Sequence, residues 1–202
     1  MNISTLPPGD RGPRLLLVVV LVAVIAVRIF YHARALRNIS KSTFLEGKFH
    51  IIARIAAALS GFALVITYLI SPAAMSWSAL ALPMWLRWAG GGLGFLSVFA
   101  LVWVHHALGE NFSGTLHLQT DHQLVTSGPY HWVRHPMYTV FYCLSLSFFL
   151  LSANWFIGLA WFVVLTIVVV NRLPREETAM IGRFGDRYRE YVARTGRFLP
   201  GL

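Results

Sequence analysis

The hydrophobic residues of this chain lie in long stretches that carry almost no charge. An α-helix needs about 20 mostly apolar residues to cross a bilayer core of about 30 Å, so each stretch is a candidate membrane helix. The pattern predicts helices at about 14–36, 51–70, 84–107, 137–152 and 155–172. The last two share the uncharged segment 137–170, which as one helix would measure about 51 Å, too long for a single crossing. Ser152, Ala153 and Asn154 provide a turn in its middle.

This pattern predicts an all-α integral membrane protein with about five transmembrane helices. The last two form a tight helical hairpin, which spans the membrane fully or reaches only part-way because each of its helices is short. The 202 residues are expected to form a single polytopic domain.

The first apolar run, residues 15–27, could instead belong to a signal peptide, because Arg11 and Arg14 precede it. Arg28 and Tyr31 follow the run, where a cleavage site would need small residues. A retained membrane helix is therefore the favoured interpretation.

The composition agrees with lipid as the main solvent. Hydrophobic residues make up 56% of the chain and charged residues 12%, whereas a typical soluble domain has about 25% charged residues. Cys143 is the single cysteine of the sequence, which excludes an internal disulfide framework.

The net charge of +9 is distributed unevenly along the chain. With five helices, 14 of the 17 Lys and Arg residues fall on one side of the membrane, in the connections 28–54 and 105–136 and in the C-terminal tail. The positive-inside rule assigns that side to the cytoplasm. We expect a multi-pass protein of the plasma membrane in a prokaryote, or of the endoplasmic reticulum in a eukaryote. No nucleic-acid partner is expected, because the basic residues flank membrane helices without a nucleic-acid motif.

The C-terminal tail predicts an amphipathic helix from Pro174 to Val192. Pro174 suits the first turn of a helix, and Met180, Phe184 and Tyr188 recur at helical spacing on one face. Basic residues on the other faces could contact anionic head groups, so membrane lipid is an expected partner.

Polar residues are concentrated in two stretches, about 108–138 and 171–200. The first closes with GPYHWVRHPMY (128–138) where the fourth helix begins, and the second opens near RLPREE (172–177) where the fifth helix ends. Because a hairpin joins these two helices, both motifs should meet at one membrane surface. We therefore expect a functional site there.

Six histidines fall between residues 105 and 135, which makes a metal site an alternative for this region. His131 and His135 are four residues apart, the spacing of zinc ligands on one helical face. Pro136 disfavours a helical conformation at residue 135, however, and the sequence has no cysteine pair or HExxH motif. No metal is expected.

Arg172 and Glu176 are also four residues apart, the spacing of an ion pair on a helix. An exposed ion pair would contribute only about 0–1 kcal/mol. These two residues lie at a predicted membrane boundary, where ionisable groups are costly and often functional. Both are therefore candidate catalytic residues.

Four motifs occur in a specific order and spacing: LVTSGPY (124–130), RHPMY (134–138), Arg172 with Glu176 and Glu177, and FGDRYREY (184–191). Together they resemble the isoprenylcysteine carboxyl methyltransferase family, whose members are integral membrane enzymes that use S-adenosylmethionine. The resemblance covers about residues 108–200 and is similar in layout to the compact prokaryotic and archaeal members.

The resemblance implies methylation of the carboxylate of a prenylated cysteine, or of a similar lipophilic carboxylate, with S-adenosylhomocysteine as product. Arg172 would bind the substrate carboxylate. The implied cofactor-binding residues are His122, Gln123, Leu124, Val125, Tyr130, His135, Pro136, Met137, Tyr138 and Glu176.

The residues agree with the chemistry that this reaction requires. An α-carboxyl group has a pKa of about 3.3–3.7, so it is ionised at neutral pH and needs no general base to attack a sulfonium methyl. The protein must instead align two reactants and exclude water. Arg172 could hold the carboxylate by two parallel hydrogen bonds, and Glu176 could bind the ammonium of the cofactor or offset its sulfonium charge.

Several alternatives remain open at this stage. A phospholipid amine or a small thiol could replace the carboxylate as methyl acceptor. The scaffold could also belong to a non-enzymatic transporter or assembly protein, or to a membrane reductase with a nicotinamide cofactor. The glycine-rich segment 90–94 could leave room for a lipid tunnel or allow close helix packing.

Overall fold

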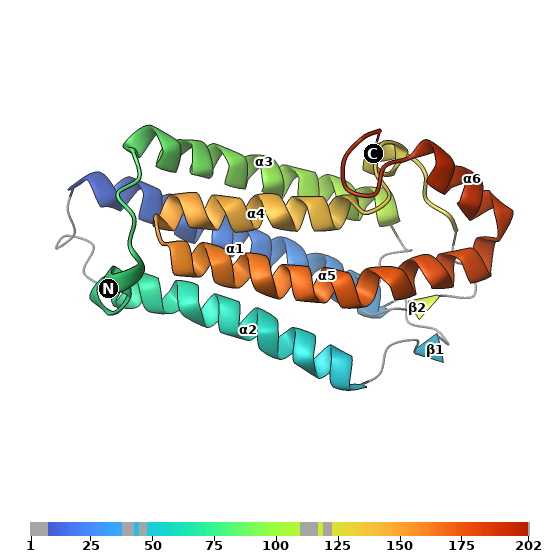
Figure 1. Cartoon of the computed structure of the whole chain (residues 1–202), viewed down its shortest axis with the longest axis horizontal. Coiled ribbons are helices and arrows are strands. Elements are labelled where there is room, and N and C mark those ends of the chain that lie inside the picture. The colour runs from blue at the N-terminus through green and yellow to red at the C-terminus, as the bar shows by residue number, and fades with distance from the viewer. Residues whose placement is uncertain (1–7, 38–42, 45–47, 110–116, 119–122, 202) are drawn as a thin grey trace.

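The computed structural model describes residues 8–37, 43–44, 48–109, 117–118 and 123–201, and within them the chain is almost entirely helical (Figure 1). The helices are α1 (Pro8–Arg37), α2 (Lys48–Ile70), the 3-10 helix η2 (Pro72–Ser78), α3 (Met84–Leu108), the 3-10 helix η4 (Gly128–His131), α4 (Pro136–Ser152), α5 (Trp155–Phe184) and α6 (Asp186–Arg194). Two-residue strands β1 (Thr43–Phe44) and β2 (His117–Leu118) pair antiparallel. The all-α fold class predicted from the sequence is confirmed, with this short pairing as an addition.

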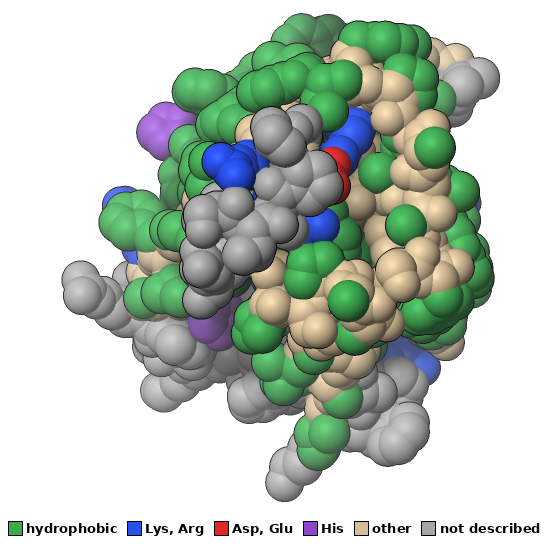
Figure 2. Space-filling view, turned by 90° about the vertical axis from the view of Figure 1, so that its left-hand side faces the viewer, with side chains coloured by type: hydrophobic (Ala, Val, Ile, Leu, Met, Phe, Trp, Pro, Cys, Tyr) green, Lys and Arg blue, Asp and Glu red, His purple; other side chains and the backbone are tan. Residues whose placement is uncertain are grey.

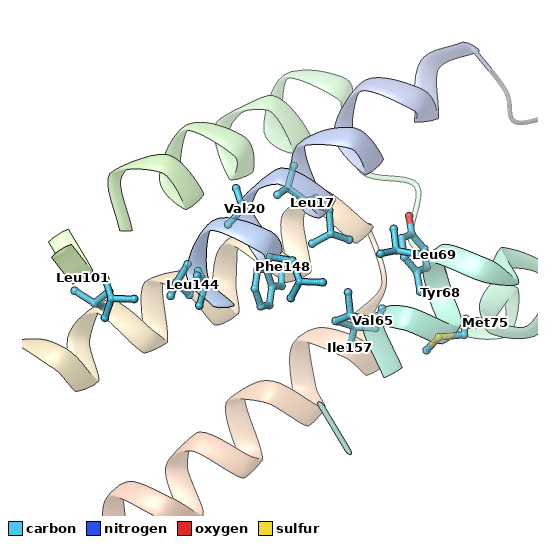
Figure 3. Packing of buried hydrophobic residues seen from close by; sticks show 14 of the residues in the cluster. Leu17, Val20, Val65, Tyr68, Leu69, Met75, Leu101, Leu144, Phe148 and Ile157 are labelled. Atoms are coloured by element: carbon cyan, nitrogen blue, oxygen red, sulfur yellow. The ribbon is translucent and has the colours of Figure 1, made fainter. Parts of the chain in front are cut away.

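The five long helices lie side by side along the long axis of the molecule (Figure 1). Helix α4 contacts α1, α3 and α5, and α2 packs against α5. Buried apolar side chains from all five helices form the shared core (Figure 3), which includes Leu17, Val20, Val65, Leu101, Leu144, Phe148 and Ile157.

Among the described residues, three helices are long and apolar enough to cross a membrane by themselves: α1, α3 and α5. Helix α2 and η2 qualify as a fourth only when taken together, and the chain bends by 112° between them. Helix α4 has 17 residues and is about 25 Å long at 1.5 Å per residue, so it is shorter than a typical hydrocarbon core. The structure therefore supports an integral membrane protein, and the number of complete crossings stays a prediction.

The predicted hairpin between α4 and α5 is confirmed, and Asn154 holds it in place. Ala153 has a φ of 48° in the turn, and the side-chain oxygen of Asn154 accepts a hydrogen bond from the Ile157 amide at 3.1 Å, which caps α5. The Asn154 amide nitrogen donates to the Met75 carbonyl at 3.0 Å and to the Ser78 hydroxyl at 2.8 Å. One buried side chain thus ties the hairpin turn to η2.

Two helices begin earlier than the hydrophobic pattern predicts. Helix α1 begins at Pro8 instead of about residue 14, with Asp10 in its first turn, and both residues suit a helix N-terminus. Helix α2 begins at Lys48 instead of residue 51. In both cases the helix begins before the apolar run. The run marks only the part of the helix that lipid surrounds.

The end predicted for the fifth helix, and the separate helix predicted from Pro174 to Val192, are wrong. Helix α5 continues through Pro174 to Phe184, and the shorter α6 follows after Gly185, which has a φ of 56°. A proline inside a helix removes one N–H donor. Packing of the buried Leu173 and the ion pair that joins residues 172 and 176 across the proline stabilise the continuous helix. The amphipathic character that was predicted for the tail is found in α6, whose Tyr188 is buried.

Glycines in α3 allow a close approach of α4. A Cβ atom at Gly90 would lie 2.5 Å from the Leu150 Cβ, and one at Gly94 would lie 2.6 Å from the Ser147 hydroxyl oxygen. The same hydroxyl donates to the Gly90 carbonyl at 2.7 Å. Lipid tails are as apolar as leucine, so such close contacts hold membrane helices together. At these positions the glycines serve helix packing and leave no room for a tunnel.

We predict that Gly90→Ala destabilises the protein by about 1–3 kcal/mol, because the new methyl group overpacks the α3–α4 contact. Gly92 is the matched control, since a Cβ there has no neighbour within 4 Å. Gly92→Ala should be neutral or stabilising by about 0.5–1 kcal/mol, because alanine favours a helix. Thermal unfolding of both variants in one detergent checks this, and equal midpoints would contradict the packing role.

Candidate active site

Four segments meet at the end of the bundle where α4 begins: η4, the first turn of α4, the second half of α5, and residues 195–198 after α6. In Figure 1 these segments lie at the end that carries α6. This is the convergence that the hairpin predicted.

Glu176 lies at the centre of this region. One carboxylate oxygen accepts a hydrogen bond from Nε of Arg172 at 2.5 Å, and the other accepts from the Tyr138 hydroxyl at 3.0 Å. Nδ1 of His135 lies 3.8 Å from the second oxygen. The structure therefore brings together both candidate catalytic residues and two of the implied cofactor-binding residues.

Glu177 binds the opposite edge of His135. Its Oε1 atom lies 3.3 Å from Nε2 of the imidazole. Arg197 binds both oxygens of the same carboxylate, with Nε at 3.1 Å from one and Nη2 at 2.7 Å from the other. His135 is thus held between two consecutive glutamates, one on each ring nitrogen.

Residues 195–198 form a strap across the start of α4, which we call the C-terminal strap. The Arg134 amide donates to the Gly196 carbonyl at 2.8 Å, and the His135 amide donates to the Arg197 carbonyl at 3.1 Å. The Thr139 hydroxyl donates to the carbonyl of residue 198 at 2.8 Å. The first two bonds pair the N–H groups of the two residues directly before α4, and the third holds the side chain of Thr139 in its first turn.

The strap also covers an apolar cluster between α4 and α5. Phe198 packs against a cluster of buried residues that contains Tyr138, Val169 and Leu173. The guanidinium of Arg134 donates to the Val192 carbonyl at 2.8 Å and also bonds the Thr195 carbonyl. The strap is therefore fixed by apolar packing as well as by hydrogen bonds.

Three tyrosines line the side of the site that faces α6. The Tyr191 hydroxyl donates to the Tyr130 carbonyl at 2.6 Å. Burial raises the pKa of Tyr188 to about 12 and that of Tyr191 to about 12. Burial, followed by the nearby Tyr191 and Glu176, also raises the pKa of Tyr130 far above its ordinary value. All three remain neutral phenols at physiological pH, so they can donate or pack but cannot serve as a base.

The other implied cofactor-binding residues within the described ranges lie at the start of α4 and in the segment before η4. Met137 lies on a face of α4 directed toward α1, where its sulfur is 4.0 Å from Nη1 of Arg28. Pro136 is buried as the first residue of α4. Gln123, Leu124 and Val125 form the segment that leads into η4, with Gln123 exposed and the other two partly buried. His122 lies outside the described residues.

The structure adds residues that the sequence reasoning did not assign. The sequence motifs include Glu177 and Arg134, but they predict no role for either residue. Arg197 and Phe198 lie in a short segment with no periodicity, so only the three-dimensional arrangement reveals them. Within the described ranges, no group of three or more His, Cys, Asp or Glu side chains is placed to hold a metal ion.

Residues 92–182 match the protein-family model described as the isoprenylcysteine carboxyl methyltransferase (ICMT) family. This range contains the His135, Tyr138, Arg172 and Glu176 cluster. Over these residues the chain is similar to the members of this family.

Curated relatives also match part of the chain. The protein-S-isoprenylcysteine O-methyltransferase of Schizosaccharomyces pombe is 35% identical over 80 residues, which is 40% of this chain and 34% of that protein. The Homo sapiens enzyme of the same name is 32% identical over 94 residues, 46% of this chain and 33% of that protein. The matched segment thus spans about a third of the length of these relatives.

A solved structure shows that the fold is shared beyond this segment. The eukaryotic intramembrane Ras methyltransferase ICMT superposes with a TM-score of 0.58 and 21% sequence identity, over 99% of this chain and 70% of that one. The common fold therefore includes α1 and α2, which lie outside the range that the family model matches.

We predict that Arg197→Ala loosens the C-terminal strap. Loss of the two hydrogen bonds to Glu177 should speed amide exchange at Arg134 and His135 severalfold, because their N–H groups are bonded to the strap. Hydrogen–deuterium exchange of the peptide that contains residues 133–139 measures the effect.

Arg189→Ala is the matched control for this experiment, because Arg189 forms an exposed ion pair with Asp186. An exposed pair of this kind contributes little, so exchange at 133–139 should stay at the wild-type rate. Equal exchange in both variants would show that the ion pair of Arg197 does not hold the strap.

Proposed function

We propose that this chain is an S-adenosylmethionine-dependent methyltransferase that methylates the carboxylate of a prenylated cysteine, or of a similar lipophilic carboxylate. The observation that carries the proposal is the cluster of Arg172, Glu176, Tyr138 and His135 at the end of apolar helices. The residues lie within the range that matches the family, and their chemistry fits both reactants.

The residues of the cluster fit a cationic cofactor. Glu176 and Glu177 offer two carboxylates for an ammonium or sulfonium group, and the neighbouring aromatic rings of Tyr130 and Tyr138 suit adenine stacking or a cation–π contact. When bound, S-adenosylmethionine supplies a methyl group on a positively charged sulfur. The other implied contacts, from His122, Gln123, Leu124, Val125, Pro136 and Met137, belong to the same proposal.

Arg172 provides the complementary charge for the acceptor. In the structure its guanidinium donates to Glu176, so the two charges offset each other. A substrate carboxylate would take the place of Glu176 on Arg172, while the Tyr138 hydroxyl keeps Glu176 in position. Arg172 would then hold the acceptor carboxylate in place, and the bound cofactor would supply the methyl group.

No general base is required in this scheme, because the carboxylate is already ionised. The buried tyrosines, with pKa values raised to about 12 at Tyr188 and Tyr191, cannot act as phenolate bases. The protein therefore contributes alignment and exclusion of water. The strap supports this role, since Phe198 packs against the apolar cluster that contains Tyr138.

The position of Arg172 suits a lipid-bound acceptor. It follows directly on the apolar part of α5, which ends with the exposed Val170. A carboxylate on a prenylated cysteine would lie at this level while its prenyl chain stays in the hydrocarbon core.

The proposed location follows from the distribution of charge. The positive-inside rule favours the cytoplasm for the side of the membrane with most of the basic residues, which supports a site on the cytoplasmic face of a plasma membrane or endoplasmic reticulum. Residues 1–202 are proposed as one domain, with the site built from about 108–138 and 171–200.

We expect purified protein to transfer labelled methyl groups from S-adenosylmethionine to a farnesylated cysteine as a base-labile ester. Arg172→Gln should lower kcat/KM about 100-fold or more while cofactor binding persists, because only the acceptor loses its partner. Glu176→Gln should instead weaken the thermal shift that the cofactor produces.

Arg175→Gln is the control, since Arg175 is an exposed arginine of the same helix. It should keep wild-type turnover. Full activity in Arg172→Gln would exclude a carboxylate acceptor in favour of an amine or thiol. Absence of both transfer and a cofactor-dependent thermal shift in the wild type would favour a non-enzymatic protein.

Tyr138→Phe should raise the KM for S-adenosylmethionine about tenfold with a smaller change in kcat, because Glu176 loses the hydrogen bond that orients it. Tyr142→Phe is the matched control one turn further along α4, where the hydroxyl bonds Thr166 instead, 3.2 Å away. Steady-state kinetics of both variants test this, and identical KM values would contradict the orienting role of Tyr138.

A further inference from the structure

The end of the bundle opposite the candidate site contains a buried cluster of charged side chains. Arg14 and Asp10 come from α1, Tyr68 from α2 and Arg87 from α3. Figure 2 views this end and shows basic and acidic side chains close together near its middle, with hydrophobic side chains around them. The cluster meets α4 at Leu151, which is 15 residues from the start of that helix and therefore about 22 Å from the candidate site.

Arg87 has clear structural partners. It is 5% exposed, its Nη1 atom forms an ion pair with Asp10, and its Nη2 atom donates to the Leu151 carbonyl at 3.0 Å. Leu151 lies in the last turn of α4, where carbonyl groups lack helical partners and the helix dipole favours a cation. Arg87 thus stabilises the end of α4.

Arg14 is in a different situation. It is 7% exposed, and its guanidinium lies over the ring of Tyr68, 4.8 Å from the centroid. Arg14 also forms a side-chain hydrogen bond with Tyr68, and two atoms of its guanidinium group remain to be accounted for. Its Nε and Nη1 atoms are buried and have no hydrogen-bond partner among the described residues.

The charges of this cluster do not balance. It has two guanidinium groups and one carboxylate, that of Asp10. A buried cation without a counter-ion is unfavourable in a medium of low polarity, and so are buried N–H donors without acceptors. An anion beside Arg14 would satisfy both requirements.

The depth of the cluster indicates which anion is available. Arg14 is four residues after the start of the apolar span of α1 at Asp10, about 6 Å along the helix. Four exposed tryptophans mark the same end of the bundle: Trp77, Trp85, Trp88 and Trp155. Such aromatic residues gather at the level of the lipid head groups, and the anion of that level is phosphate.

We propose that Arg14 binds the phosphate of an anionic phospholipid in the leaflet at this end of the bundle. The unpartnered Nε and Nη1 atoms would each donate to a phosphate oxygen, and Arg87 adds positive charge to the same cluster. The acyl chains would lie on the exposed apolar face of α1 formed by Leu15 and Val19. The site is independent of the proposed methyl transfer, because it lies at the other end of the helices.

The test compares thermal unfolding of the full chain in phosphatidylcholine nanodiscs with and without phosphatidylglycerol. The wild type should unfold about 5 °C or more higher with phosphatidylglycerol when that lipid saturates the site. Arg14→Gln should lose this shift. Arg34→Gln, which removes an exposed charge at the far end of the same helix, should keep it.

The outcomes are distinct. A shift produced by inorganic phosphate in phosphatidylcholine alone, and lost in Arg14→Gln, would support the anion site and assign it to a free anion. A lower midpoint of Arg14→Gln by the same amount in both lipids would overturn the proposal, because it would show only a structural contact with Tyr68.

A second measurement applies if Arg14→Gln does not fold. The wild-type protein should then retain about one phosphatidylglycerol per chain through detergent washes that remove phosphatidylcholine, as counted by mass spectrometry of extracted lipid. Equal loss of both lipids would overturn the proposal.

Discussion

The position of the candidate site depends on the register between α4 and α5, which Asn154 fixes. This side chain begins α5 by accepting from the Ile157 amide and holds η2 against the turn. From this point the two helices run antiparallel in step: Tyr142 and Thr166, each 12 residues from Asn154, are joined by their hydroxyl groups. One turn nearer the start of α4, Tyr138 meets Glu176, which lies ten residues beyond Thr166 on α5. A shift of one residue in the pairing of α4 with α5 would turn the side chains of one helix by about 100° relative to the other. These groups would then no longer meet.

The main features of the fold follow from hydrophobic periodicity. Charge-free runs indicate helices, and Ser152 to Asn154 marks the hairpin turn, so the meeting of Arg172, Glu176, His135 and Tyr138 follows from topology. The sequence is less informative where the local preference of a residue type competes with packing against distant parts of the chain. Pro174 favours a helix start when it is considered alone, yet the helix runs through it because Leu173 is buried. Glycines 90 and 94 allowed two interpretations, and only the position of α4 decides between them.

Other features could not be predicted because they depend on contacts that are distant in sequence. The strap binds α4 mainly through backbone carbonyl groups, which every residue has, so no side-chain pattern marks it. Arg14 and Arg87 were counted only as basic residues that flank membrane helices. Their burial results from the packing of α1, α2 and α3, and nothing in the neighbouring sequence shows that they meet.

Pro174 has a mechanical consequence for the site. Because proline has no N–H group, the Val170 carbonyl loses its helical donor at this point, and α5 is most easily bent there. Arg172 lies before the proline and Glu176 after it, on either side of the weakened turn. The strap and α6 are attached to the part of the helix beyond it. Bending at this joint changes the distance between guanidinium and carboxylate, so the ion pair can open while the membrane-embedded half of the helix stays still.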